Sequence, residues 1–285
     1  MDRKSFLKKA ALGIAATSGL TLSGKGAEAM KDAIENDESV DTKEENMSAK
    51  FVLHPAMSRG HANHGWLKSF HSFSFANYHN PEKMNFGVLR VLNDDTVAPG
   101  RGFGKHPHDN MEIISIPLEG DLEHEDSMGN TSVIRQGDVQ IMSAGTGVFH
   151  SEYNKNSNQE VKFLQIWLFP QERNIEPRYD QRSYPAEDRK NRFQTVVSPV
   201  EDEAVTINQQ AWFSLGNFDS EKSSSYQINR KGNGAYAFLI KGKAKIDGHE
   251  LNERDAIGVW DTDKIDIQFE KDSELLIMDI PMALR

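Results

Sequence analysis

Residues 112–120 read EIISIPLEG, a short apolar run that stops at a glycine, and the same pattern recurs along most of the chain. Comparable runs occupy residues 86–92 (FGVLRVL) and 161–168 (VKFLQIWL), and Asn, Asp or Pro follows each of them closely. β-Branched and aromatic residues favour extended backbone, whereas Gly, Asn, Asp and Pro favour the turns that end a strand. No long stretch repeats its apolar residues every 3.6 positions, as an amphipathic helix would. The sequence therefore predicts an all-β fold with few, short helices.

The second half of the chain repeats features of the first half. Residues 235–240 (AYAFLI) lead into Lys-Gly as residues 113–118 lead into Glu-Gly. The stretch 170–192 between the halves is rich in prolines and charges, which is typical of a domain boundary. We therefore predict two related β-barrels, at residues 51–170 and 171–285.

The N-terminus predicts a segment for export. The first residues are basic, residues 10–22 form a weakly apolar run, and AEA at 27–29 fits a cleavage site between small residues. The apolar run is shorter than the roughly 20 residues that span a bilayer, so we expect no stable membrane anchor. RKSFLK at 3–8 resembles a twin-arginine signal with Lys4 in place of the second arginine, and a general secretory signal stays open. We expect an export signal at residues 1–29 and a periplasmic protein, or a cytoplasmic one if the signal is not used.

Residues 30–50 carry seven acidic and three basic residues and no aromatic residue. Such a stretch cannot bury enough apolar surface to offset its ordering entropy, so we predict a disordered acidic tether. The whole chain has a net charge of −10, which makes nucleic acid a poor partner because its phosphates carry the same sign. The chain contains no cysteine, so any metal ligand must be a histidine, a carboxylate, a backbone group or water.

Nine of the ten histidines lie before residue 151. Within this region, residues 104–112 read GKHPHDNME. Alternate residues of a strand point to the same side, so His106 and His108 can face one point. His150 and Glu152 repeat the same spacing further along the chain. We predict that these three imidazoles and a carboxylate surround one ion and leave one or two positions open.

The carboxylate that completes the set stays open at this point. Glu112 has the strand parity of His106 and His108 if their strand continues, so it competes with Glu152. A set of imidazoles and one carboxylate suits Fe(II), Mn, Ni, Cu or Zn better than Ca or Mg. Four other histidines stand alone, and we expect them to be surface residues or hydrogen-bonded core residues: His54, His71, His79 and His124.

Five segments carry a more specific signal: residues 59–75 (RGHANHGWLKSFHSFSF), 104–108 (GKHPH), 124–129 (HEDSMG), 140–147 (QIMSAGTG) and 150–153 (HSEY). Together they closely resemble the pirin family of cupin proteins. The resemblance covers the chain from about residue 51 to its end and is densest up to about residue 184. The general cupin pattern fits less well, because SAG at 143–145 replaces its usual Pro-x-Gly.

This resemblance implies two cupin barrels, with a single metal site in the first barrel. The ligands would be His106, His108, His150 and Glu152. Fe(II) is the usual ion, and Glu112 would then contact the ligands instead of the ion. The general cupin arrangement would make Glu112 the ligand. The second barrel contains His249 alone, so it lacks a ligand set of its own.

Bacterial pirins are associated with quercetin 2,3-dioxygenase activity, which opens the central ring of a flavonol with O2 and releases carbon monoxide. The resemblance therefore implies an oxidoreductase with a flat polyphenol and O2 as its partners. Glu152 would act as both a ligand and the base for the substrate hydroxyl. Five large side chains would either line the substrate slot or pack in the core: Trp66, Phe73, Phe75, Met111 and Phe149.

Two other functions stay open. A non-catalytic metal-binding or redox-sensing module, as eukaryotic pirin is described, would act through a protein partner that the sequence does not identify. A zinc hydrolase or isomerase would use a similar ligand set. The acidic surface and the predicted export argue against a role in transcription. Elemental analysis and oxygen uptake with a flavonol would separate these functions.

Overall fold

The computed structural model describes residues 49–284, in which strands predominate. The helical elements of this range are two 3-10 turns, η1 (Ala56–Ser58) and η2 (Ala186–Arg189). The prediction of an all-β fold is therefore confirmed. The expected export signal and nearly all of the expected tether lie outside the described residues. Within residues 49–284, no helix is long and apolar enough to cross a membrane.

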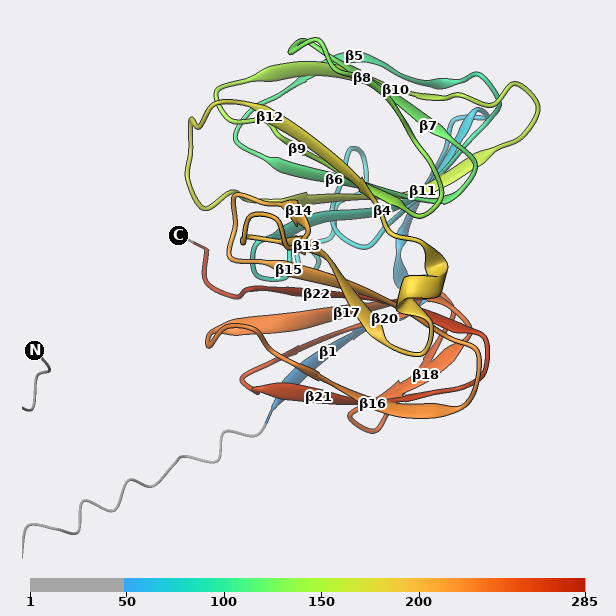
Figure 1. Cartoon of the computed structure of the whole chain (residues 1–285). Helices are drawn as coiled ribbons and strands as arrows, with labels where there is room; N and C mark the ends of the chain where they lie inside the picture. The colour runs from blue at the N-terminus through green and yellow to red at the C-terminus, as the bar shows by residue number, and fades with distance from the viewer. Residues whose placement is uncertain (1–48, 285) are drawn as a thin grey trace, which may run out of the picture. The chain divides into compact units, whose positions relative to one another are not determined.

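Two antiparallel sheets form the first barrel (Figure 1). The larger sheet consists, in order, of β12 (Arg178–Ser183), β9 (Asp138–Ser143), β6 (Glu112–Glu119), β11 (Val161–Leu168), β4 (Leu89–Val97), β3 (Leu67–His71) and β2 (Gly60–Asn63). The smaller sheet consists of β5 (Gly102–His108), β10 (Val148–Asn154), β7 (Leu122–Asp126) and β8 (Thr131–Ile134). The smaller sheet carries the histidine motifs.

The second barrel repeats this architecture. Its larger sheet consists of β1 (Lys50–His54), β20 (Ala256–Trp260), β17 (Asn233–Lys241), β22 (Ser273–Pro281), β15 (Trp212–Phe218), β13 (Phe193–Ser198) and β14 (Val205–Thr206). Its smaller sheet consists of β16 (Lys222–Gln227), β21 (Lys264–Phe269), β18 (Lys243–Ile246) and β19 (His249–Asn252). An apolar core that includes Phe218, Ile246 and Phe269 fills this barrel. The two barrels therefore share a fold and differ in what they enclose.

The two barrels exchange strands, which differs from the expected boundaries. β1 opens the described chain, yet it pairs with β20 and completes the sheet of the second barrel. β12 follows residue 170, yet it pairs with β9 in the first barrel. In Figure 1 the blue strand β1 accordingly lies among the orange and red strands. The apolar pattern of a strand indicates that the strand exists but not which strand it pairs with, so the exchange could not be predicted from the sequence.

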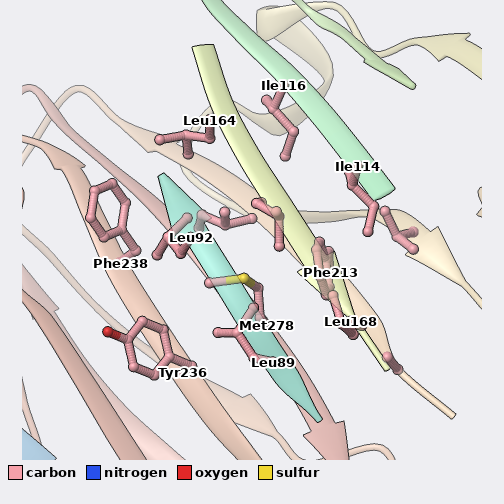
Figure 2. Packing of buried hydrophobic residues seen from close by; sticks show 14 of the residues in the cluster. Leu89, Leu92, Ile114, Ile116, Leu164, Leu168, Phe213, Tyr236, Phe238 and Met278 are labelled. Carbon is pink, nitrogen blue, oxygen red and sulfur yellow. The ribbon is translucent and has the colours of Figure 1, made fainter. Parts of the chain in front are cut away.

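A core of apolar side chains joins the large sheets of the two barrels (Figure 2). The first barrel contributes Leu92, Ile114 and Leu164, and the second contributes Phe238 and Met278. These residues come from strands far apart in the chain and are all nearly inaccessible to solvent. The large sheet of the first barrel is therefore covered on its outer face, so its strands carry apolar residues on both sides.

Strand β6 shows how this arrangement positions the site. Its residues Ile114 and Ile116 belong to the core between the barrels. Ile113 belongs instead to a cluster inside the first barrel, and Ser115 points the same way because alternate residues share a face. The continuous apolar run at residues 112–118 thus results from burial on both faces. Odd-numbered residues of β6 face the barrel interior, where the histidines also lie.

Candidate metal centre

Strands β5 and β10 bring three histidines together. The two strands are antiparallel, and His150 lies opposite His106. Along β10, burial alternates, so His150 and Glu152 point into the barrel while Phe149 points outward. His106, His108 and His150 each offer one ring nitrogen, and these three nitrogens lie within 4.8 Å of one another. The spacing of two residues in each motif therefore produces the predicted convergence.

The three imidazoles are held in the form that binds metal. The Nδ1 of His106 lies 2.8 Å from the carbonyl oxygen of Gly104, to which it donates, so Nε2 is left for a ligand. Burial, aided by the neighbouring histidines, lowers the pKa of His108 to about 4 and that of His150 to about 3. Both rings are therefore neutral at neutral pH, as metal ligation requires. Within the described chain, Nε2 of His108 and both nitrogens of His150 are buried without a hydrogen-bond partner.

Glu152 borders the same cluster from the inner side. Its Oε1 accepts a hydrogen bond of 2.9 Å from Ser115 Oγ, and its Oε2 accepts one of 2.7 Å from Gln165 Nε2. A carboxylate oxygen of Glu152 lies within 4.8 Å of a ring nitrogen of His150 and one of His124. Two groups of potential ligands therefore overlap at His150, one of three histidines and one that contains Glu152.

A row of polar residues crosses the large sheet below Glu152. Strand registers place these residues side by side on five neighbouring strands: Gln140, Ser115, Gln165, Asn93 and His71. All of them are buried. Each belongs to a different strand and is separated from the others by many residues, so the sequence alone did not group them. The row supplies the hydrogen bonds that hold the Glu152 carboxylate inside an otherwise apolar barrel.

His124 is the residue that sequence reasoning missed. It was expected to stand alone, but β7 places its ring 5.4 Å from that of His150, between ring centroids. Its Nε2 lies 3.1 Å from Oδ2 of Asp126. A signal was present, because His124 and Asp126 repeat the two-residue spacing of the two ligand motifs.

Glu112 lies elsewhere. It accepts hydrogen bonds from Ser143 Oγ at 2.7 Å and from the backbone N–H of Asn208 at 3.1 Å. Its side chain shares the face of β6 that meets the second barrel, and burial raises its pKa. Among residues 49–284, neither group of potential ligands includes Glu112. Glu112 does not share the face of His106 and His108, because their strand does not continue to it. β5 ends at His108 and the chain turns at Asn110, whose φ is +47°, before β6 begins.

The five candidates for a substrate slot separate into different environments. Phe73 lies in the core between the barrels. Trp66 packs, with Phe103, against a separate apolar cluster of the first barrel that includes Leu122 and Phe163. Met111 packs on the apolar cluster beside Trp167. Phe75 packs edge-on against Trp167, and Phe149 is 50% exposed on the outer face of β10. Trp167, which was not among the candidates, approaches the site most directly, with its ring 4.8 Å from that of His108.

The remaining lone histidines agree with the expected roles. His54 is buried, and its Nδ1 lies 2.8 Å from the hydroxyl of Tyr236. His71 is buried and contacts Asn93 through Nδ1 at 2.9 Å. His79 is exposed. Hydrogen bonds to the protein explain the burial of His54 and His71, and exposure to solvent explains His79, so none of the three requires a ligand.

Two barrels of this topology define a bicupin. Within residues 49–284, the first barrel holds the candidate metal centre and the second is filled by an apolar core. Comparison with known families agrees with this class. The profile of the Pirin family matches residues 50–168, and that of the quercetinase C-terminal cupin domain matches residues 195–280. A protein of Escherichia coli K12 named quercetin 2,3-dioxygenase is 44% identical over 230 residues, which cover 80% of this chain and 98% of that protein. The chain belongs to the pirin family.

Solved structures and other relatives extend this comparison. The crystal structure of the bacterial pirin YhhW from Escherichia coli, in complex with nickel(II), is 41% identical and has a TM-score of 0.77. The match covers 82% of this chain and all of that chain. A putative quercetin 2,3-dioxygenase of Zymomonas mobilis is 40% identical over 80% of this chain and 97% of its own length.

The donor set fits a divalent transition metal. Three imidazoles converge, and the buried nitrogens Nε2 of His108 and Nδ1 and Nε2 of His150 have no partner in the described part of the chain. A carboxylate with fixed orientation stands next to them. Imidazole and carboxylate donors together suit a transition metal better than Ca or Mg. His106 and His108 are half-buried, so the cluster is accessible from the side of β5.

Proposed function

We propose that this protein is a metal-dependent dioxygenase that cleaves flavonols such as quercetin with O2. The convergence of His106, His108 and His150 beside Glu152, with buried nitrogens of His108 and His150 that have no partner among residues 49–284, is the observation that carries the proposal. The names of relatives that are about 40% identical over nearly their whole length support the substrate class. We further propose Fe(II) as the ion, because its redox chemistry would let electrons pass from the substrate to O2.

His106, His108 and His150 would hold the ion through one nitrogen each. Burial keeps His108 and His150 neutral, and the hydrogen bond from His106 to Gly104 fixes which nitrogen of His106 is available. Trp167 stands edge-on to His108 and offers an apolar surface to a flat ring. The accessible side at β5 would admit the substrate, while the barrel interior excludes bulk water.

Glu152 would serve as the base for the flavonol 3-hydroxyl and as the fourth ligand. Ser115 and Gln165 each donate to one of its oxygens and hold the carboxyl group in a fixed orientation. When one oxygen accepts the substrate proton, the donor on the other oxygen continues to hold the side chain in place. The carboxyl group thus keeps its orientation in both protonation states, as a general base must.

Oxygen uptake and carbon monoxide release with quercetin test the proposal. The Fe(II)-loaded protein is expected to consume O2, and the His106→Ala variant is not. The zinc-loaded protein is expected to bind quercetin without turnover, because Zn²⁺ has no redox chemistry. Equal turnover by the zinc form would refute the dioxygenase mechanism. If no metal form consumed O2 with any flavonol, the protein would instead act as a metal-binding interaction module.

A further inference from the structure

A second side-chain pair faces the candidate metal centre from β7. His124 is fully buried, and one of its ring nitrogens lies within 4.8 Å of a ring nitrogen of His150 and a carboxylate oxygen of Glu152. Asp126, two residues later, contacts Nε2 of His124 at 3.1 Å. The pair therefore lies at the edge of the space where the ligands converge.

Asp126 fixes how the His124 ring carries its hydrogen. The carboxylate accepts hydrogen bonds from the backbone N–H groups of Met128 and Asn130, at 2.9 and 3.1 Å, and from Asn130 Nδ2 at 2.8 Å. These donors favour the ionised carboxylate, which can only accept. Nε2 of His124 must then hold the hydrogen that points at Asp126. In the neutral ring, Nδ1 is left as a hydrogen-bond acceptor.

This acceptor lacks a donor among residues 49–284, although it is buried. Buried polar atoms are nearly always hydrogen-bonded, and an exception at a site points to a missing partner. Tyr179 packs its ring 4.9 Å from that of His124, but its hydroxyl is bonded to Ser132 and Gln181. The missing donor therefore has to come from outside residues 49–284.

We infer that His124, oriented by Asp126, accepts a hydrogen bond from a substrate hydroxyl other than the one whose proton Glu152 takes. This inference rests on the proposed function and extends it to substrate specificity. Both oxygens of Glu152 already accept from the protein, whereas Nδ1 of His124 is free to accept. The site would thus favour flavonols with several hydroxyl groups over a flavonol that carries the 3-hydroxyl alone.

Binding of two flavonols to the zinc-loaded full chain tests this role without turnover. We expect the wild-type protein to bind quercetin more tightly than 3-hydroxyflavone, which has a single hydroxyl. His124→Leu should weaken quercetin binding by about 10- to 100-fold, the loss expected when a buried hydrogen bond to the ligand disappears. Binding of 3-hydroxyflavone should change little. His124→Asn, which keeps an acceptor near the position of Nδ1, should restore part of the preference for quercetin.

Further variants separate this role from structural effects. Asp126→Asn offers Nε2 a donor in place of an acceptor, so the ring hydrogen moves to Nδ1 and the preference for quercetin should again be lost. His54→Leu removes a buried histidine in the second barrel and should leave the preference intact. Metal content should remain near that of the wild type in His124→Leu. Folding of every variant is checked by circular dichroism.

The outcomes distinguish the two proposals. If the wild-type protein bound both flavonols equally well, or if His124→Leu weakened both equally, the role of His124 would be refuted while the proposed function stood. A loss of metal in His124→Leu as large as in His106→Ala would make His124 a metal ligand and would also overturn the inference. If the wild-type protein bound neither flavonol, the proposed function would fail, and the inference with it.

Discussion

Asp95→Asn is expected to change how the stability of the metal-free protein depends on pH. Asp95 lies on β4 and is 3% exposed. In the pairing of β4 with β3 it lies opposite Ser69. Burial raises the pKa of Asp95 to about 7 from the ordinary value of 3.8, against the opposing effect of Ser69. Its Oδ1 has no hydrogen-bond partner in the part of the chain that the structure describes. An amide at this position cannot ionise, so the variant removes the titration.

The magnitude follows from these two pKa values. Between pH 3.8 and about pH 7, the folded protein keeps a proton that the unfolded chain releases. The stabilisation from neutral Asp95 is therefore fully present below the unfolded-state pKa of 3.8. It is lost as the pH rises through the folded-state pKa of about 7. One pKa unit corresponds to about 1.4 kcal/mol, so the total loss is about 4 kcal/mol. The variant should gain this amount relative to the wild type over the same interval.

Urea denaturation from about pH 4 to about pH 8 measures the effect. The quantity to follow is the difference in unfolding free energy between Asp95→Asn and the wild type, because contributions from the buried histidines cancel in it. Asp263→Asn, at an exposed turn, is the matched control and should follow the wild-type curve at every pH. A difference that stays constant across this pH range would refute the assignment of a raised pKa to Asp95.

Three further predictions concern the site and the N-terminus. Alanine in place of His106, His108 or His150 should lower metal affinity by more than about 100-fold in a protein that stays folded, and full metal content in two of them would argue against the centre. Glu152→Gln should lose more metal affinity than Glu112→Gln in chelator competition; the reverse order would favour the general cupin arrangement. Protein recovered from cells should begin near Met30 by mass spectrometry, whereas an intact Met1 on most of it would contradict export.

Local patterns in the sequence predicted the features that depend on local geometry. The two-residue spacing of His106 and His108, and of His150 and Glu152, placed each pair on one face because a strand alternates its side chains. Runs of apolar residues between turn residues located the strands because β-branched and aromatic residues favour extended backbone. The position of Glu112 did not follow, because a turn at Asn110 separates it from the first histidine pair.

Features that depend on pairing between distant strands were not accessible from one sequence. Gln140 and Gln165 meet in a polar row only because β6 lies between their strands. His124 reaches His150 only because β7 pairs with β10. Strand order is set by the packing of the whole barrel, and the residues of a single strand do not encode it. The exchange of β1 and β12 is another result of this kind.

The pairing of β1 with β20 has a consequence for how the chain reaches its final state. Lys50 pairs with Trp260, so the first strand of the described residues finds its partner only when most of the chain has been made. Contacts between residues so far apart in the chain form slowly, because a large loop must close first. In the folded protein, β1 belongs to the sheet of the second barrel and β12 to that of the first, so each strand links the two barrels. A protease that cut between residues 171 and 177 would leave two fragments still bound to each other, each holding a strand that completes the other's sheet.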